Sequence, residues 1–436
     1  MTRPEHDRTR NFAFRMATKL ALTVGWALIA ANLPAQAQTL TRLHDFNSNQ
    51  GYSQGFGALA GPAIDRAGNL YGTLAQGGIQ FGTAYELQRK GSGWIFNLLH
   101  TFVGNLTNDG AHPYSGLVFG PDGALYGTTY QGGGDNSGQC FYGCGTVYSL
   151  RPPPSACKSA LCPWNETVIY HFAGGSDGAY PGYGNLTFDS AGNIYGTTSD
   201  GGANGLGTVY ELSPSNGGWT ETVLYSFAGG GDGWRPWGPV TVDAAGNLYG
   251  TTYYGGSSAC GVDGCGTIYR LSPSALGWTH TVLYSFQNLD DGMLPIAGLV
   301  FDSAGNLYGG TSLGGSGTGG TIFQLTPSGS GWNFNLLCSL VGSPPYNGGL
   351  VNNLTSDSAG NLYGTAFWDP DGVGSLFKLV RSNGWTCNQI YSFRNSGQYG
   401  PGDPRGSVAL DGNGNIYGTS IYGGRDDVGT VWEITP

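Results

Sequence analysis

The chain has 436 residues, of which 80 are glycine and only 11% are charged, and its formal net charge is −10. Nucleic acids and anionic lipids bind to clustered Lys and Arg, which this acidic chain lacks, so we expect neither as a partner. No segment after residue 37 is long and apolar enough to span a bilayer.

Residues 1–37 have the composition of a signal peptide. Basic side chains that include Arg10, Arg15 and Lys19 precede an apolar run from Leu20 to Ala31, and Ala35-Gln-Ala37 fits a cleavage site of small residues. The apolar run of about 12 residues is short for a retained membrane anchor, which is the alternative. We predict export to the periplasm or the extracellular space. The mature chain, residues 38–436, then keeps 13 basic and 26 acidic residues and a formal charge of −13.

The rest of the chain is a tandem repeat. The stretch Asp189-Ser-Ala-Gly-Asn-Ile-Tyr-Gly-Thr-Thr198 has seven copies, whose Tyr-Gly pairs are 54 to 69 residues apart. A period of this size predicts one supersecondary unit repeated in a stack or around an axis. The tyrosines of the seven pairs are Tyr71, Tyr126, Tyr195, Tyr249, Tyr308, Tyr363 and Tyr417.

The third copy shows what one repeat builds. Residues 184–189, 193–198, 208–212 and 219–227 are four short stretches of alternating or β-forming residues separated by turn signals. The Asp-x-x-Gly motif between the first two stretches predicts a tight turn with a positive φ at its glycine. Four short strands per repeat, with no helical periodicity in the mature chain, predict an all-β propeller with one blade per repeat.

The order of the strands predicts how the propeller closes. Six fourth strands follow a third strand, whereas the seventh precedes the first repeat, at Leu43-His-Asp-Phe46. We therefore predict that Thr39–Phe46 pairs with Thr430–Ile434 and completes the last blade, because such pairing removes open sheet edges. Residues 38–436 then form one seven-bladed β-propeller domain, which we expect to be a monomer.

The cysteines predict local disulfides. All eight follow the predicted signal peptide, and an even number suits an oxidising compartment. We predict the bonds Cys140–Cys144, Cys157–Cys162 and Cys260–Cys265, each closing a small loop. Cys338 and Cys387 belong to the fourth strands of neighbouring blades, and their pairing stays open. Zinc is a weaker interpretation, since no copy contains a Cys-x-x-Cys pair.

A candidate ligand-binding face follows from the blade topology. The loops from strand two to three and from strand four to the next blade open on one face, and they carry acidic and aromatic residues. Rings stacking on sugars and carboxylates accepting hydroxyl hydrogen bonds would suit a neutral polyhydroxylated ligand. The candidate ligand-binding residues are Trp234, Trp237, Tyr253, Tyr254, Tyr180, Tyr183, Asp177, Asp232, Asp291 and Asp109. Tyr130, Trp368 and Tyr422 end other second strands.

The four aspartates have a second interpretation. Each belongs to an Asp-Gly-x-x-Pro loop, and an Asp that recurs in four copies is better explained by capping its own turn than by one ligand. The unrepeated aromatics, above all Trp234 and Trp237, are the stronger candidates for ligand contacts, although aromatic side chains also cover seams between blades.

The sequence contains no convincing catalytic or metal-binding motif. No histidine has a metal-ligand neighbour at i+2 or i+4, and no phosphate-cradling Gly-Lys pair occurs. Calcium needs six to eight oxygen ligands, whereas each connecting loop offers one carboxylate. We therefore assign no catalytic residue, no metal and no cofactor. Paired carboxylates could still act on a glycoside or uronide, and the sequence alone does not pair them.

The repeat resembles the GloVer-type (Gloeobacter/Verrucomicrobia) tandem repeat of secreted bacterial proteins. The resemblance rests on Asp-x-Ala-Gly-Asn-Leu-Tyr-Gly-Thr-Thr, then Gly-Gly, then Gly-Thr-Val-Tyr-Glu-Leu, and it runs from about Leu43 to Pro436. Departures occur at Gly120, where the turn Asp is lost, and at Ala366 and Ser375. The resemblance implies export and a repeat architecture, and it carries no assigned activity.

Three functional hypotheses follow. The first is a secreted, non-enzymatic β-propeller that binds an extracellular glycan or protein. The second is a polysaccharide lyase or glycoside hydrolase acting at the channel mouth. The third is a purely structural envelope protein. Binding without turnover favours the first hypothesis, and release of reducing ends or unsaturated products favours the second.

Overall fold

The structure is a computed structural model that describes residues 38–47, 54–104, 108–134, 139–153, 163–329, 331–342, 353–367, 373–381, 384–393 and 400–436. The predicted signal peptide, the predicted bond Cys157–Cys162 and Trp368 lie outside these residues. The described chain is built of β-strands, and its only helical elements are short 3-10 turns such as η2 (Gly230–Asp232) and η3 (Ser258–Cys260). Among the described residues, no helix is long and apolar enough to cross a bilayer.

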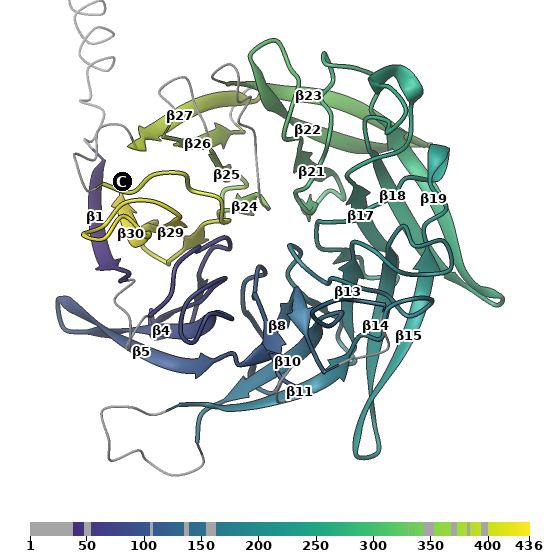
Figure 1. Cartoon of the computed structure of the whole chain (residues 1–436). Coiled ribbons are helices and arrows are strands. Elements are labelled where there is room, and N and C mark those ends of the chain that lie inside the picture. The colour runs from purple at the N-terminus through teal and green to yellow at the C-terminus, as the bar shows by residue number, and fades with distance from the viewer. Residues whose placement is uncertain are drawn as a thin grey trace, which may run out of the picture. The chain divides into compact units, whose positions relative to one another are not determined.

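Seven antiparallel four-stranded sheets follow one another around a ring within the unit Leu40–Thr435 (Figure 1). We number these sheets as blades 1 to 7. Blade 1 contains β2 (Ala63–Ile64), β3 (Leu70–Leu74), β4 (Thr83–Lys90) and β5 (Gly93–Thr101). Blade 2 contains β7 (Val118–Phe119), β8 (Leu125–Thr129), β10 (Thr146–Arg151) and β11 (Asn165–His171). Blade 3 contains β12 (Thr187–Phe188), β13 (Ile194–Thr198), β14 (Thr208–Ser215) and β15 (Gly218–Ser226), and blade 4 contains β16 (Thr241–Val242), β17 (Leu248–Thr252), β18 (Thr267–Ser274) and β19 (Gly277–Ser285). Blade 5 contains β20 (Val300–Phe301), β21 (Leu307–Gly310), β22 (Thr318–Ser328) and β23 (Gly331–Val341); blade 6 contains β24 (Thr355–Ser356), β25 (Leu362–Ala366), β26 (Ser375–Val380) and β27 (Thr386–Ser392); blade 7 contains β28 (Ala409–Leu410), β29 (Ile416–Ser420), β30 (Thr430–Thr435) and β1 (Thr39–Asp45).

The ring closes as predicted. The order of strands in blade 7 is β1-β30-β29-β28, so the first strand of the chain forms the outer edge of its last blade. The Phe46 N–H donates to Gly429 O at 3.0 Å, and the Phe46 ring is buried. On the inner side, Thr419 Oγ1 donates to Ala60 O at 2.8 Å and joins blade 7 to blade 1. The all-β, seven-bladed prediction is therefore confirmed.

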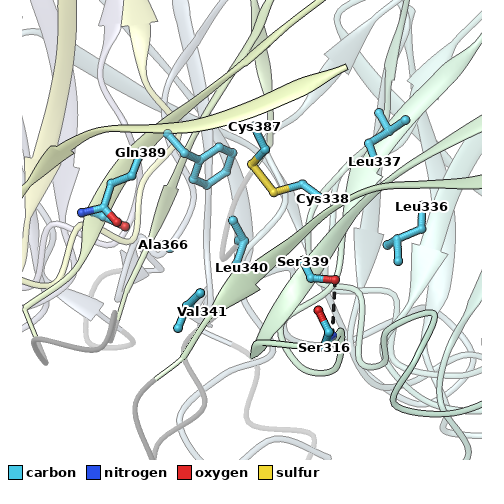
Figure 2. A pocket seen from close by; sticks show the side chains of 12 residues that line it. Ser316, Leu336, Leu337, Cys338, Ser339, Leu340, Val341, Ala366, Cys387 and Gln389 are labelled. Atoms are coloured by element: carbon cyan, nitrogen blue, oxygen red, sulfur yellow. Dashed lines mark hydrogen bonds between the residues drawn. A yellow bond between two sulfur atoms is a disulfide. The ribbon is translucent and has the colours of Figure 1, made fainter. Parts of the chain in front are cut away.

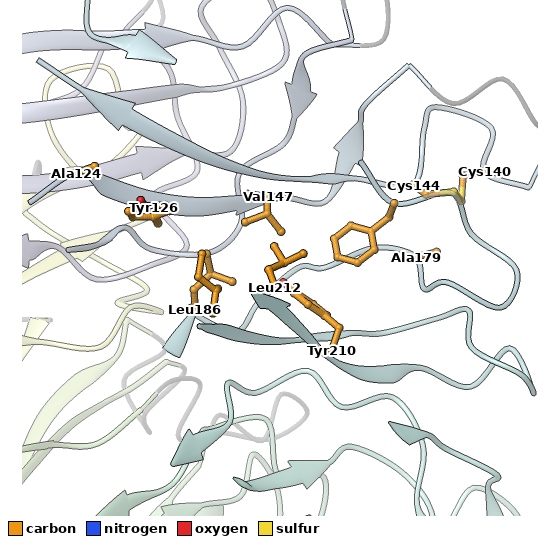
Figure 3. Packing of buried hydrophobic residues seen from close by; sticks show 11 residues of the cluster. Ala124, Tyr126, Cys140, Cys144, Val147, Ala179, Leu186, Tyr210 and Leu212 are labelled. Atoms are coloured by element: carbon orange, nitrogen blue, oxygen red, sulfur yellow. A yellow bond between two sulfur atoms is a disulfide. The ribbon is translucent and has the colours of Figure 1, made fainter. Parts of the chain in front are cut away.

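The apolar core lies between adjacent blades. Seven clusters of buried side chains each combine residues of two neighbouring blades, one cluster for each of the seven junctions. Figure 3 shows the junction of blades 2 and 3, where Val147 and Tyr126 face Leu212 and Tyr210. One blade alone would leave these faces in water, so each blade is stabilised by its neighbours.

Each letter of the Asp-x-x-Gly-Asn-x-Tyr motif has a structural role. In blade 3, Asp189 Oδ1 accepts the N–H groups of Ala191 and Asn193 at 2.9 Å, and its other oxygen accepts Asn193 Nδ2 and the Tyr195 hydroxyl. Gly192 has φ = 88°, as the turn prediction requires. The same network occurs around Asp65, Asp243, Asp302, Asp357 and Asp411.

The Gly-Thr-Thr part of the repeat joins strands and blades. A Cβ on Gly127 would lie 2.6 Å from the Tyr148 hydroxyl, because the third-strand aromatic ring packs over this glycine. The first threonine of the pair reaches the next blade: Thr251 Oγ1 donates to Ala297 O at 3.0 Å. The second threonine bonds the hydroxyl of a third-strand threonine, as in Thr252 and Thr267. These residues therefore recur from repeat to repeat because they make contacts that hold strands and blades together.

Blade 2 departs from the common turn and compensates for it. Gly120 stands where the other blades have the turn aspartate. Asp122 instead accepts a hydrogen bond from the Tyr126 hydroxyl at 2.8 Å and one from the Ala124 N–H at 3.1 Å.

The innermost strands are shorter than the sequence predicts, with only two residues each. Neighbouring backbones pack closely beside them: a Cβ on Gly184 would lie 2.7 Å from Pro239 N.

The outer strands of neighbouring blades contact each other through one pair of side chains, whose residue types differ from junction to junction. A fourth-strand side chain faces a residue of the next blade's fourth strand, in an arrangement that we call the outer pair. The outer pairs include stacked rings (His44 and Phe96, Tyr225 and His280, Tyr284 and Phe334) and the disulfide Cys338–Cys387. This last bond settles the pairing that the sequence left open. The predicted bonds Cys140–Cys144 and Cys260–Cys265 are confirmed.

Candidate functional site

The loops entering successive blades share one backbone conformation on the predicted ligand-binding face, which we call the loop face. In the loops entering blades 2, 3, 4, 5 and 7, the residue before the proline has a positive φ, between 54° and 60°. This conformation is unusual for a non-glycine residue, and a following proline normally favours extended backbone. The five residues with this φ are His112, Tyr180, Arg235, Leu294 and Asp403. One rigid backbone therefore presents five different side chains around the loop face.

Hydrogen bonds hold this backbone in place. The Tyr180 N–H donates to Cys144 O of the preceding blade at 2.8 Å, and Tyr180 O accepts the Ser199 N–H at 3.2 Å. The incoming loop also forms a β-bridge with the loop from strand two to strand three, for example between Trp234 and Tyr254. In blade 2 this bridge extends into a two-stranded ribbon of β6 (Gly110–Ala111) and β9 (Gln131–Gly132).

The structure places the four predicted aspartates inside their own loops. Asp177 accepts the Ala173 N–H at 2.6 Å and the Tyr170 hydroxyl at 2.9 Å. Asp232 and Asp291 accept the equivalent groups, and Asp109 accepts the N–H groups of its own loop at 2.6 and 2.7 Å. This is turn-capping geometry, with the carboxylates directed at protein donors.

Two of these carboxylates differ in their electrostatics. Burial raises the pKa of Asp177, and its two hydrogen bonds only partly oppose the effect. Burial also acts on Asp232, but hydrogen bonds from His280, Tyr225 and Ala228 N–H lower its pKa. The added partner of Asp232 is His280 on the outer strand of the next blade, whose Nδ1 lies 3.0 Å from Oδ1; the equivalent residue near Asp177 is Glu221.

The predicted aromatics form one connected group of rings, which we call the aromatic arc. Trp237 stacks on Tyr253 with centroids 4.1 Å apart, and Trp234 stacks on Tyr254 at 4.5 Å. Tyr183 joins the tryptophan side to the tyrosine side, since it lies 5.5 Å from Trp237 and 5.3 Å from Tyr114. The arc consists of Tyr114, Tyr130, Tyr180, Tyr183, Trp234, Trp237, Tyr253 and Tyr254.

The arc lies on the loops that enter and cross blades 2 to 4, and its rings are only partly buried. Tyr183 is 41% exposed, and the other seven rings have intermediate exposure. Burial raises the pKa of Tyr130 to about 12, with smaller contributions from neighbouring hydroxyls and Asp200. Burial also raises the pKa of Tyr180 and of Tyr183. These hydroxyls are therefore protonated at neutral pH and available as donors.

Two residues of the loop face that the sequence analysis missed carry opposite charges. The Arg235 guanidinium lies over the Trp234 ring, 5.3 Å from its centroid, and its Nη2 is 3.7 Å from Asp200 Oδ1. Burial is the main cause that raises the pKa of Tyr180, and the nearby charge of Asp200 is the second cause. The arc ring Tyr114 was missed as well. A signal was available, because Arg235 aligns with Tyr180 before a proline and Tyr114 aligns with Trp237 after one.

A separate pocket of about 640 Å³ lies at the junction of blades 5 and 6 (Figure 2). The Cys338–Cys387 disulfide and Leu340 form part of its wall, and the Ser316 N–H donates to Ser339 Oγ at 3.3 Å. Its lining mixes apolar side chains with those of Ser316, Ser339, Ser375 and Gln389, and none of the described residues that line it is charged. It therefore offers little to a polyhydroxylated ligand, and we place the candidate site on the aromatic arc.

These features define a closed seven-bladed β-propeller whose repeated residues serve the fold and whose loop face carries the chemical variation. The chain belongs to the Gloeobacter/Verrucomicrobia repeat family, whose model matches residues 139–275 and 258–436. No curated protein matches it in sequence.

Solved structures share the fold at low identity. An ulvan lyase of polysaccharide lyase family 25 is 11% identical with a TM-score of 0.52, and the match covers 91% of this chain and 95% of that one. The same enzyme bound to a glucuronate–sulfated rhamnose chain gives a TM-score of 0.51 at the same identity and coverage. A gluconolactonase from Xanthomonas campestris is 14% identical over 62% of this chain and 74% of its own, with a TM-score of 0.36. At this identity the likeness to the lyase concerns the fold alone, and the gluconolactonase match carries no argument because its TM-score is below 0.5.

Proposed function

We propose that this protein is a secreted, non-enzymatic β-propeller that binds an extracellular glycan on the aromatic arc. The observation that carries the proposal is the arc itself, eight partly exposed rings in continuous contact on one rigid loop face. Pyranose rings present apolar C–H faces that stack on aromatic side chains, while their hydroxyls need the donors and acceptors that Tyr hydroxyls and Asp200 supply.

Charge favours a neutral glycan. The chain carries a formal charge of −10, and Arg235 beside the arc is already close to Asp200. A polyanionic chain would be repelled at long range by the protein's net charge. Two disulfides in loops of this face, Cys140–Cys144 and Cys260–Cys265, support an oxidising compartment, because such bonds persist outside the cytosol.

The test is isothermal titration of purified protein with neutral and uronic-acid oligosaccharides. We expect neutral oligosaccharides to bind without release of reducing ends. Tyr254→Ala should weaken binding, whereas Tyr422→Ala is the matched control, because Tyr422 forms the equivalent β-bridge on blade 7 outside the arc. Equal loss in both variants, or no binding of any oligosaccharide, contradicts the proposal.

One observation favours cleavage as a second candidate function. His112, next to the arc, has Nδ1 2.9 Å from Ala75 O, which fixes Nδ1 as the protonated nitrogen and leaves Nε2 as a potential base. Its ring lies 6.1 Å from Tyr114. Incubation with uronic-acid polysaccharides distinguishes the two functions, since a lyase releases unsaturated products and His112→Gln would abolish their formation.

A further inference from the structure

Three side chains that are distant in the sequence meet at the junction of blades 1 and 2. His100 lies on β5, Asp109 lies in the loop that enters blade 2, and Glu166 lies on β11. One nitrogen or oxygen atom from each lies within 4.8 Å of the other two. From the sequence we counted one carboxylate for each connecting loop, whereas here the second carboxylate comes from the outer strand β11.

The three groups are held in place and partly buried. The Asp109 carboxylate accepts the N–H groups of Val103 and Gly110, and its side chain is 9% exposed. The His100 side chain is 19% exposed and packs edge-on against Phe102. Glu166 Oε1 is buried and has no hydrogen-bond partner. An unpaired buried carboxylate oxygen is costly, so this site lacks a positively charged or donating group.

The contact between His100 and Asp109 has the spacing of two ligands on one ion. His100 Nε2 is 3.4 Å from Asp109 Oδ2, which is long for a hydrogen bond to a carboxylate. Zinc bonds of about 2.0–2.2 Å in a tetrahedron place neighbouring ligand atoms about 3.4 Å apart. A shift of the Glu166 carboxylate by roughly 1 Å would bring the third ligand to the same distance.

The next two junctions show that this combination is specific. At the junction of blades 2 and 3, Tyr170 replaces the histidine beside Asp177 and Glu221. At the junction of blades 3 and 4, His280 lies only 3.0 Å from Asp232, an ordinary hydrogen bond. Within the described part of the chain, only His100, Asp109 and Glu166 bring three such ligands together.

We propose that His100, Asp109 and Glu166 form a zinc site, with a water as the fourth ligand. The ion joins the outer strand of blade 1 to that of blade 2 and neutralises the unpaired carboxylate. It also fixes the loop that leads from Asp109 to His112 and Tyr114, so it supports one end of the aromatic arc. A metal that binds the folded state and not the unfolded state stabilises it by RT ln(1 + [L]/Kd), so zinc should raise the Tm.

The experiment is zinc titration of untagged full-length protein after chelator dialysis, followed by calorimetry and thermal unfolding. Two variants remove a ligand: His100→Tyr, which installs the residue that blades 2, 3 and 4 carry at this position, and Glu166→Gln. Glu221→Gln at the neighbouring junction is the matched control. Tyrosine is accommodated at this position elsewhere in the ring, so His100→Tyr is expected to fold.

We expect wild-type protein and Glu221→Gln to bind one equivalent of zinc with a higher Tm in its presence. Both ligand variants should lose about 100-fold or more in affinity and show no zinc-dependent rise in Tm. Absence of stoichiometric binding to the wild type overturns the proposal. So does a loss of less than about tenfold in both ligand variants, which would leave Glu166 as a protonated acid bonded to Asp109.

Discussion

The two faces of the propeller follow opposite rules. On the face formed by the Asp-x-x-Gly turns, which we call the turn face, six aspartates make the same four hydrogen bonds, to two N–H groups, an asparagine amide and a tyrosine hydroxyl. On the loop face, five loops share one backbone conformation but carry a histidine, a tyrosine, an arginine, a leucine and an aspartate at the strained position. In this chain, the side chains that recur in every blade serve the fold, and the side chains that change on a constant backbone are those that we propose contact a ligand.

Both faces belong to one closed ring, and the largest effect that we predict is the loss of stability when this ring is opened. A chain beginning at Gly51 lacks β1 and leaves the β30 edge and its apolar face exposed. Loss of the buried Phe46 ring alone should cost about 3–5 kcal/mol. We expect a large fall in Tm and self-association, measured by calorimetry and size-exclusion chromatography. An unchanged Tm in a monomeric truncated protein would refute the closure.

The next effect separates the turn face from ligand binding. Asp243→Ala removes the acceptor of four hydrogen bonds and should destabilise the protein by about 1–2 kcal/mol while leaving glycan affinity unchanged. Burial alone would raise the pKa of Asp243, but hydrogen bonds from Asn247, Tyr249 and Ala245 lower it. The stabilisation is therefore present above the ordinary Asp pKa and is lost as the pH falls through the lowered value. Urea unfolding of both proteins at neutral and at strongly acidic pH checks this, because their difference should shrink in acid.

On the loop face the effects should be reversed. Trp237→Ala should lower glycan affinity about tenfold, which corresponds to about 1–2 kcal/mol for one stacked ring, with little change in Tm. Asp232→Ala, in the loop that also carries Trp237, should lower the Tm and leave binding by the folded protein intact, because its carboxylate caps the loop. Titration and calorimetry of the two variants measure both properties. Unfolding caused by Trp237→Ala would show that the arc serves the fold instead.

The smallest predicted effect concerns Glu221 at the junction of blades 2 and 3. Burial, assisted by Asp177, raises the pKa of Glu221 to about 7. A carboxyl with a raised pKa favours folding most below its ordinary pKa and loses that contribution as the pH rises through about 7. Wild-type Tm should therefore fall between pH 5 and pH 8 relative to the Tm of Glu221→Gln. A parallel pH dependence in the two proteins would mean that Glu221 is not held in the acid form.

The sequence predicted the parts that depend on neighbours along the chain. Blade number, closure and the bonds Cys140–Cys144 and Cys260–Cys265 all follow from spacing and strand order. The capping geometry of the aspartates agrees with the interpretation that repetition suggested. The role of the aromatics as ligand contacts stays a prediction, although the structure brings all six predicted rings into one arc.

The sequence could not reveal contacts across a junction, because these depend on how far one blade is rotated from the next. Cys338 and Cys387 occupy the two positions of an outer pair, and only the observed pairing of Tyr225 with His280 or Tyr284 with Phe334 shows that such positions meet. For the same reason, the sequence did not show that Glu166 lies close to His100 and Asp109: the distance between the outer strands of neighbouring blades was not known. With the outer-pair rule established, the Cys338–Cys387 bond and the approach of Glu166 to His100 can both be predicted from an alignment of the seven repeats.

Pairing of β1 with β30 also sets the order of folding. We expect β1, the first strand of the ring to be synthesised, to be the last to find its partner, because β30 lies at the opposite end of the ring's sequence and the Thr419–Ala60 contact spans 359 residues. Six blades have their strands supplied locally, whereas the seventh waits for an encounter between the chain ends, at the entropic cost of closing a very long loop. During that interval the third strand of the last blade is an unprotected edge, and this is the stage at which the protein is most exposed to aggregation.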